Sequence, residues 1–220
     1  MKNSLKKLWK ENKLLFIFIG LMLVFRSAVA DWSDVPTGSM KPTIVEGDRI
    51  FINKMAYDIR LPFTHISLVT LSEPQTNDII IFDSVVSDKR LVKRVIGVPG
   101  DTVTMRNNKL IINNQVISYK KESTTNLPSN NYHDKIETIN GQPHFIRTSK
   151  LASQLDNFNQ VIVPTGQYLV LGDNRDNSAD SRVIGLVPRK EIVGKSSQVA
   201  FSLDYNNNFL PRTNRFFHSL

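Results

Sequence analysis

The chain begins with a continuous apolar run and continues with short segments of strand-like composition. Residues 14–25 (LLFIFIGLMLVF) are apolar apart from one glycine, and helical periodicity is scarce after them. The later segments are rich in β-branched and aromatic residues, and Gly, Pro, Asn or Asp bounds most of them, which is typical of β-strands. These segments are residues 48–57, 78–86, 90–98, 101–118, 166–173 and 191–204. The pattern predicts a mainly β fold, arranged as a barrel-like sandwich.

Residues 119–160 break this pattern, because they carry little apolar periodicity and many polar residues. We therefore expect a smaller β module that is inserted into the main β domain. The predicted organisation is a basic N-terminus (1–13), an apolar helix (14–30), a β domain built from 31–105 and 161–205, an inserted module (106–160) and a C-terminal tail (206–220). The pattern indicates no role for the insert or for the tail.

Charge is concentrated at the N-terminus. The chain has 220 residues, enough for a sizeable core, and a formal net charge of +8. Six basic residues and one acidic residue lie in residues 1–30, which gives that segment +5 and leaves +3 for residues 31–220. The body shows no basic tract with interleaved aromatic residues, so we expect no nucleic-acid partner.

Two interpretations of the N-terminal segment are open at this point. A basic start, a short apolar run and an Ala-x-Ala site at 28–30 are typical of a cleavable signal peptide. Alternatively, residues 14–30 form a retained membrane helix of roughly 25 Å, which is short for a bilayer core of ~30 Å. Arg26 would then extend to the headgroups, and a tryptophan on either side would mark the interfaces. The lysines before the apolar run place the N-terminus in the cytoplasm in either case.

The absence of cysteine restricts the possible chemistry. With no Cys in the sequence, disulfides, thiolate catalysis and Cys-ligated zinc are excluded. The four histidines, His65, His133, His144 and His218, do not stand at metal-ligand spacing from one another. We therefore expect no metal or other cofactor, whereas counting alone does not exclude a catalytic histidine.

The loop around Ser39 is the first candidate for chemistry. The segment VPTGSMKPTIVEGD (35–48) places this serine next to Gly38 and between two prolines. Prolines fix φ and glycine admits unusual conformations, so the segment is a rigid irregular loop that can hold one side chain in place. From this stretch alone, a serine that caps a turn is the more common interpretation, and a nucleophile is the alternative.

A lysine within an apolar strand would be able to activate such a serine. Lys93 lies in LVKRVIGVPGD (91–101), and alternation places it on one face with Leu91 and Val95. Burial disfavours a charged amine and would lower its pKa from about 10.4, and a neutral amine is a competent base for a hydroxyl. A snorkelling or outward-facing lysine is the more common interpretation of an isolated strand residue. A phosphate-binding loop matches poorly, because the lysine precedes the glycines.

A polar cluster, LGDNRDNSADSR (171–182), is the third candidate. Its alternating Asp and Asn resemble a calcium loop, but Arg175 falls among the expected ligands and the twelve-residue spacing fails. We therefore predict a polar turn whose charges pair with one another. Asp180 and Arg182 are two residues apart and share a face on an extended segment, and Ser178 is a small hydroxyl able to bond an amine.

Taken together, these motifs resemble those of the bacterial type I signal peptidases. The order of an apolar N-terminal segment, PTGSMKPT, GDRIFINK, KRVIGVPGD, GDNRDNSADSR and GLVP followed by IVGK is similar to the order in that family. The resemblance covers about residues 35–195, apart from most of the 106–160 insert. It implies a membrane-bound serine protease with a Ser-Lys dyad on a β-rich fold. It also implies a retained N-terminal helix, which favours the second interpretation of residues 14–30.

The resemblance implies roles for residues of the first two motifs. Ser39 resembles the family's nucleophile and Lys93 its general base. Thr37 occupies the place of a hydroxyl that helps the Ser39 amide form the oxyanion hole. We expect shallow apolar pockets beside the dyad, which accept Ala and reject larger side chains by clash. The residues expected to line these pockets are Val35, Pro36, Met40, Ile44 and Val92.

The resemblance extends to the third motif. Ser178 resembles the residue that orients the lysine, and Asp180 and Arg182 match a supporting ion pair. The family usually has an aromatic residue shortly after this pair, where this chain has Val183 and Ile184. That departure affects packing and leaves the implied catalytic roles in place.

The implied function is a membrane-bound serine endopeptidase that removes signal peptides from exported preproteins, cleaving after small residues in Ala-x-Ala sequences. Its expected location is the bacterial plasma membrane, crossed once, with the N-terminus in the cytoplasm and the catalytic domain outside. Its expected partners are preprotein signal peptides and membrane lipid, and we expect a monomer. Two alternatives remain: a narrow-specificity Ser-Lys peptidase dedicated to pilin or conjugation substrates, and a non-enzymatic tethered β domain that binds partners.

Overall fold

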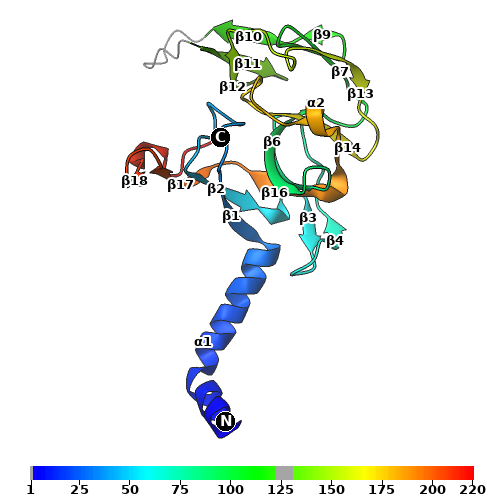
Figure 1. Cartoon of the computed structure of the whole chain (residues 1–220). Helices are drawn as coiled ribbons and strands as arrows, with labels where there is room; N and C mark the ends of the chain where they lie inside the picture. The colour runs from blue at the N-terminus through cyan, green and yellow to red at the C-terminus, as the bar shows by residue number, and fades with distance from the viewer. Residues whose placement is uncertain (1, 122–130) are drawn as a thin grey trace.

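Nine strands form the central sheet of the chain in a computed structural model that describes residues 2–121 and 131–220 (Figure 1). Their order is β15-β14-β6-β5-β16-β2-β17-β18, and β1 pairs with β2. The members are β1 (Ala30–Asp34), β2 (Asp48–Asn53), β5 (Ile79–Ser84), β6 (Lys89–Gly97), β14 (Gln167–Leu171), β15 (Val187–Pro188), β16 (Ile192–Ser196), β17 (Val199–Asp204) and β18 (Leu210–Pro211). The predicted strand segments outside 101–118 all contribute to this sheet, so the mainly β fold is confirmed. The barrel-like closure stays a prediction.

Two smaller sheets lie at the end of the molecule remote from the N-terminal helix (Figure 1). One has the order β13-β7-β8-β9 and the other β10-β11-β12. Their members are β7 (Thr102–Arg106), β8 (Lys109–Ile112), β9 (Gln115–Val116), β10 (Ser118–Lys121), β11 (Tyr132–Ile139), β12 (Gln142–Ser149) and β13 (Phe158–Ile162). The Asn-Asn turns predicted within 101–118 are present, with positive φ at Asn107, Asn108, Asn113 and Asn114.

The long hairpin β11–β12 is the main feature that the hydrophobic pattern did not reveal. Glu137 and His144 are both buried and pair across its strands, so polar residues stand where alternation would show apolar ones. Residues 122–130 of the predicted insert lie outside the described residues. One hydrophobic cluster contains Ile96 and Leu169 from the central sheet together with Val103 from the four-stranded sheet. Because the core is shared in this way, the boundaries of the inserted module stay a prediction.

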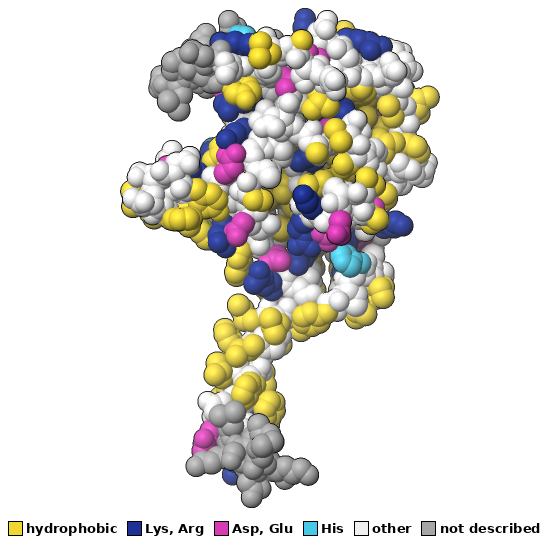
Figure 2. Space-filling model, viewed as in Figure 1, with side chains coloured by type: hydrophobic (Ala, Val, Ile, Leu, Met, Phe, Trp, Pro, Cys, Tyr) yellow, Lys and Arg dark blue, Asp and Glu magenta, His cyan; other side chains and the backbone are white. Residues whose placement is uncertain are grey.

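The N-terminal segment forms the helix α1 (Lys2–Ala28), whose backbone departs from helical geometry at Asn12. Its large apolar side chains from Leu14 to Phe25 are exposed, and they gather along the helix in Figure 2. The predicted helix is thus confirmed from residue 14 to Ala28. Its predicted end at residue 30 is wrong, because Ala30 pairs with Asn53 as the first residue of β1. Among the described helices, none combines the length and the hydropathy that crossing a membrane requires.

α1 continues almost directly into the central sheet. The Val29 N–H donates to Phe25 O at 2.8 Å, and β1 begins at the next residue. The Lys54 ammonium donates to the Arg26 carbonyl at 2.9 Å, and Arg26 Nε lies 2.7 Å from the carboxylate of Asp31. The junction between helix and sheet is therefore held by side chains as well as by the backbone.

The remaining elements are short. A hairpin of β3 (Asp58–Arg60) and β4 (Ser67–Thr70) lies near the sheet end of α1 (Figure 1), and α2 (Ser181–Ile184) begins within the polar cluster. Within the described residues, 3-10 helices are formed by Lys54–Ala56, Arg189–Glu191 and Thr213–Arg215. The tail packs on the sheet, because Arg215 donates to both carboxylate oxygens of the buried Asp48, at 2.9 and 2.6 Å.

Candidate active site

Ser39 and Lys93 meet in the folded chain. Lys93 Nζ lies 2.8 Å from Ser39 Oγ and 2.9 Å from the carbonyl oxygen of Val92. The serine belongs to the loop after β1, and the lysine lies in the middle of β6. The lysine side chain is buried, since the residue is only 2% exposed, whereas the serine is partly exposed. The pairing inferred from two separate motifs is thus present as a direct contact.

The surroundings of Lys93 favour its neutral form. Burial lowers the pKa of the amine from its ordinary value to about 8, because desolvation penalises the ammonium. The carboxylates of Asp180 and Asp173 act in the opposite direction, and the guanidinium of Arg182 adds to the lowering. Desolvation is the largest of these effects, so the amine binds a proton more weakly than an exposed lysine does.

The Ser39 loop is anchored on both sides of the serine. The Val35 N–H donates to Asp48 O at 3.0 Å, and the Ile44 N–H donates to Met40 O at 2.9 Å. Met40 and Ile44 are buried at 1% and 0% exposure in one hydrophobic cluster beneath the loop. Burial of the residues after the serine holds the loop in place and leaves the hydroxyl at the surface of the core.

Two predicted supporting hydroxyls make no side-chain hydrogen bond in the described structure. Thr37 is exposed on the Ser39 loop. Ser178 is buried, and its Oγ has no partner among the described groups. The predicted contact between Ser178 and the lysine is therefore absent in this arrangement, although Ser178 lies in the same site: a β-carbon placed on Gly172 would meet both Ser178 and the Ser39 carbonyl.

Asp180 and Arg182 form the ion pair expected from their spacing. Arg182 Nε and Nη2 donate to the two carboxylate oxygens of Asp180 at 2.8 and 2.6 Å. Asp180 caps α2, and one of its oxygens accepts the Gly172 N–H at 2.9 Å. The pair is nearly inaccessible to solvent, so both charges are satisfied by each other and by backbone groups.

Comparison with known proteins identifies the family. Residues 8–201 match the sequence family described as signal peptidase, peptidase S26. The chain belongs to this family. A signal peptidase I of Pseudomonas aeruginosa is 36% identical over a match that covers 90% of this chain and 76% of the relative. A signal peptidase I of Bacillus amyloliquefaciens is 34% identical, with 91% and 89% covered.

A crystal structure of a signal peptidase I from Enterococcus faecalis is also similar, at 32% identity and a TM-score of 0.36. The match covers 57% of this chain and 98% of that chain. The family and the relatives establish this S26 chain as a serine peptidase, a hydrolase that acts in the removal of signal peptides.

The S26 site contains one residue of the polar cluster, Asn174, to which the sequence assigned no role. The Asn174 N–H donates to Ser39 O at 3.0 Å, and its side-chain amide donates to Gly38 O at 2.9 Å. The prediction that the charges of the polar cluster pair with one another is wrong for Asp173 and Arg175, which pair with Arg94 and Glu137 on other strands. In the sequence, only the position of Arg94 next to Lys93 could have indicated that Arg94 contributes to the site.

The residues predicted to line substrate pockets occupy two kinds of position. Val35, Met40 and Ile44 are buried in one cluster, and the partly buried Val92 packs against it. Pro36 is exposed and does not belong to that cluster. Contact of any of the five with substrate stays a prediction.

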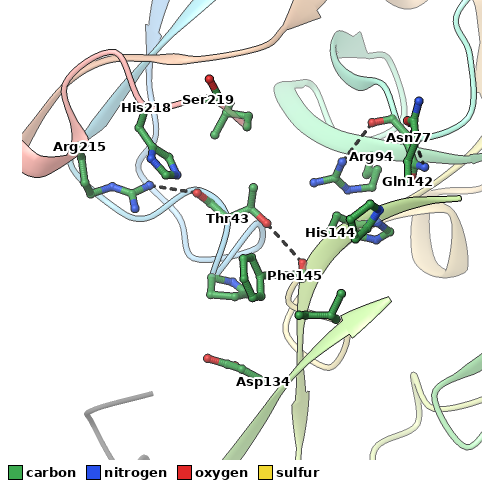
Figure 3. Close-up of a pocket in the computed structure, with 14 residues that line it drawn as sticks. Thr43, Asn77, Arg94, Asp134, Gln142, His144, Phe145, Arg215, His218 and Ser219 are labelled. Atoms are coloured by element: carbon green, nitrogen blue, oxygen red, sulfur yellow. Dashed lines mark hydrogen bonds between the residues drawn. The ribbon is translucent and has the colours of Figure 1, made fainter. Parts of the chain in front are cut away.

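A cavity of about 630 Å³ lies among the residues drawn in Figure 3. It opens between the end of the Ser39 loop, the hairpin β11–β12 and the C-terminal segment, and neither Ser39 nor Lys93 lines it. Thr43 and Arg94 on its wall both donate to the carboxylate of Asp173. The wall of the cavity is therefore bonded to the carboxylate of the residue that precedes Asn174.

Proposed function

We propose that this peptidase cleaves signal peptides with Ser39 as nucleophile and Lys93 as general base. The observation that carries the proposal is the 2.8 Å contact between the buried Lys93 Nζ and Ser39 Oγ. A serine hydroxyl needs an adjacent base to become a nucleophile, and a desolvated amine with a pKa of about 8 is such a base near neutral pH.

The proposed reaction has two stages. In the neutral state of Lys93, the Ser39 hydroxyl donates to the amine, transfers its proton and attacks the scissile carbonyl carbon. The resulting ammonium then protonates the leaving amine of the mature chain, and the carbon–nitrogen bond breaks to leave an ester on Ser39. In the second stage a water molecule gives a proton to the neutral Lys93 amine and attacks the ester carbonyl carbon. The bond from that carbon to Ser39 Oγ then breaks as the Lys93 ammonium returns the proton to Ser39, and the signal peptide leaves with a free carboxylate.

The oxyanion of each tetrahedral intermediate would be stabilised by the Ser39 N–H and the Thr37 hydroxyl. Within the described residues, no protein group accepts a hydrogen bond from either of them. Thr37 is exposed two residues before the nucleophile, so its hydroxyl is free to turn towards bound substrate. Donors that are fixed before the reaction stabilise developing charge more effectively than water does.

The dyad is tested by cleavage of a purified preprotein in detergent. Ser39→Ala and Lys93→Ala should each abolish cleavage, and Lys93→Arg should fail as well, because a guanidinium stays protonated. Lys109→Ala, a change at an exposed lysine of β8, is the matched control and should cleave normally. Substantial turnover by a Lys93 variant would show that another group is the base.

Specificity for small residues is the second part of the proposal. Val35, Met40, Ile44 and Val92 belong to one apolar cluster, and we expect its surface beside the dyad to offer shallow pockets that suit a short side chain such as Ala. A preprotein with Ala at the first and third positions before the scissile bond should therefore be preferred. Replacing either Ala with Phe should reduce kcat/KM sharply, while the same replacement at the second position serves as the control. Equal rates would refute shallow pockets.

Membrane attachment through α1 is the third part. The apolar side chains from Leu14 to Phe25 form a contiguous exposed surface, which is unfavourable in water. Because they are exposed on all sides of the helix, lipid is the environment that would bury them. Because basic residues precede this surface, we expect the N-terminus on the cytoplasmic side of the plasma membrane and the peptidase domain outside. The full chain should resist carbonate extraction, and a Phe18→Lys/Leu21→Lys variant should be released. A wild-type chain that is extracted would contradict this attachment.

A further inference from the structure

Asn174 bonds two successive carbonyl groups of the nucleophile loop. Its backbone N–H donates to Ser39 O at 3.0 Å, and its side-chain amide donates to Gly38 O at 2.9 Å. Gly38 O also accepts the Lys41 N–H at 3.1 Å, so both of its lone pairs are occupied. Asn174 is buried, with 3% exposure, and competes with no solvent for these bonds.

The bond to Gly38 O fixes the direction of the Ser39 N–H. The two groups belong to one planar trans peptide, in which the carbonyl and the N–H point in opposite directions. Holding the carbonyl against Asn174 therefore turns the N–H towards the opposite side of the loop. Among the hydrogen bonds of the described residues, none has the Ser39 N–H as its donor. The Ser39 N–H is therefore oriented by the peptide plane and is available to donate to another group.

Asn174 itself is held by its neighbours. Asp173 accepts Arg94 Nε and Nη2 at 2.8 and 2.7 Å, and Arg175 Nη1 donates to Glu137 at 2.8 Å. The backbone on both sides is bonded to Arg147 of β12, through Asp173 O and the Arg175 N–H, each at 2.8 Å. The segment cannot shift without breaking buried ion pairs.

One polar atom of the Asn174 side chain is buried without a hydrogen bond, which a purely structural role does not explain. Its Oδ1 is buried and has no hydrogen-bond partner among the described groups. An unpaired buried oxygen is unfavourable, so stability alone would favour another residue here. The opposite amide orientation would set Oδ1 against Gly38 O, two acceptors facing each other, and is excluded by that repulsion.

We propose that Asn174 is a positioning residue that orients the Gly38–Ser39 peptide so that the Ser39 N–H faces the oxyanion of the reaction. This inference rests on the proposed function, in which Ser39 is the nucleophile and its amide an oxyanion donor. It extends that function, because the bond acts through the peptide plane and leaves the contact between Ser39 and Lys93 untouched.

Asn174→Ala and Asn174→Asp test the inference. Both keep the backbone bond to Ser39 O and remove the side-chain donor; in the second, a carboxylate faces Gly38 O. Loss of an oxyanion donor reduces kcat by about 10²–10³-fold, so a misaligned donor should reduce it by at least about 10-fold. KM should change little, and the apparent pKa of the kcat/KM profile should stay that of the wild type, because Lys93 is unaffected.

Inhibitor binding separates this role from a structural one. A peptide aldehyde, which forms a tetrahedral adduct on a serine, should bind the two variants at least about 10-fold more weakly than wild type. A non-cleavable peptide of the same sequence should bind all three proteins equally. Asn177→Ala, at an exposed residue of the same type in the same segment, is the matched control and should behave as wild type.

The outcomes distinguish the inference from the function on which it rests. Activity in Ser39→Ala or Lys93→Ala would overturn the proposed function itself. If those variants are inactive, wild-type kcat in Asn174→Ala would overturn the positioning role alone. Equal loss of binding for aldehyde and non-cleavable peptide would also overturn it, since it would show that Asn174 only maintains the shape of the site.

Discussion

Gly172 packs directly against Ser178: a β-carbon on the glycine would lie 2.3 Å from Ser178 Oγ. The same atom would lie 2.5 Å from the Ser39 carbonyl oxygen. Contacts under 3.0 Å are essentially never adopted by real β-carbons. The chain at the end of β14 therefore approaches the Ser39 loop as closely as a backbone can, and the absence of a side chain on Gly172 permits this approach.

Gly172→Ala should inactivate the peptidase. The new methyl group would displace the Ser39 backbone, which the serine loop cannot accommodate without moving its hydroxyl away from Lys93. A displacement of about 1 Å at a reacting group reduces the rate by about 10²-fold. Gly20→Ala in α1, where nothing lies within 4 Å of the new atom, is the control. Preprotein cleavage measures both, and wild-type kcat/KM in Gly172→Ala would contradict the close packing.

The pH dependence of activity should reflect the lowered pKa of the buried Lys93 amine. Burial lowers the pKa of Lys93 to about 8, and only the neutral amine accepts the proton of Ser39. We expect kcat/KM to rise with pH through one apparent pKa near 8, well below the ordinary value of about 10.4. A profile centred near 6.5 that disappears when one of the four histidines is replaced would indicate a histidine base instead.

Stability should rise with pH over the range between the two pKa values of Lys93. The folded chain releases the proton near pH 8, whereas the unfolded chain retains it up to about pH 10.4. Between these values the unfolded state binds more protons, so the free energy of unfolding increases by at most about 1.4 kcal/mol per pH unit. The total gain is about 3 kcal/mol, and it is absent below pH 8.

Lys93→Met isolates that contribution. The variant has a similar shape and no titrating group, so its stability curve should lack the rise, and it should be more stable than wild type at pH 7. Denaturant unfolding in detergent from pH 7 to 10 measures the difference between the two proteins. Parallel curves would show that the amine is solvated in the folded state.

Removing a charge from the buried pair of Glu137 and Arg175 should destabilise the protein, whereas removing the charge of Lys93 should stabilise it. Both side chains are fully inaccessible, and His144 Nε2 lies 3.1 Å from the same carboxylate. The nearby guanidinium holds the pKa of Glu137 below its usual range despite burial. Glu137→Leu should reduce the free energy of unfolding by about 3–5 kcal/mol, because Arg175 stays buried without its partner.

The double variant Glu137→Leu/Arg175→Met is the control for that loss. Removing both charges leaves no unpaired ion, so most of the stability should return. Thermal unfolding of the wild type and the variants provides the comparison. A double variant as unstable as Glu137→Leu would show that packing, rather than the unpaired charge, is responsible.

The Ala28–Ala30 segment should survive although it resembles a cleavable sequence. Ala28 is the last residue of α1, the Val29 N–H is bonded to Phe25 O, and Ala30 already pairs with Asn53 of β2. A protease binds its substrate as an extended strand with free amides, and none is available here. N-terminal sequencing of protein from membranes should show no start at Asp31; a dominant start there would mean that the segment is removed.

The pairing of Ser39 with Lys93 could be predicted because the order of several motifs resembles that of a known family. The local patterns alone favoured a serine that caps a turn and a lysine that snorkels or faces outward. The ion pair of Asp180 with Arg182, by contrast, is local. The Asn-Asn turns follow from the tolerance of asparagine for positive φ.

The other ion pairs of the site and the hairpin β11–β12 could not be predicted, because they depend on contacts between segments distant in the sequence. Arg175 is paired with Glu137, 38 residues away, and Asp173 with Arg94, 79 residues away. A single sequence gives no indication of such partners, because the charges look the same whether they face solvent or one another. The hairpin β11–β12 was hidden for the same reason, since buried charges replaced the apolar residues that alternation detects.

The direct junction of α1 with β1 would set the distance of Ser39 and Lys93 from a membrane that holds the helix. One residue separates helix from strand, and Ser39 follows five residues after the strand ends at Asp34. Once α1 is held in lipid, as proposed, there is no hinge through which the dyad could travel along the membrane normal. The peptidase would then cleave at a fixed distance from the membrane. A preprotein would be cut only where its own membrane segment holds a peptide bond at that distance. Choice of the cleavage site would depend on distance from the bilayer as much as on the size of a side chain.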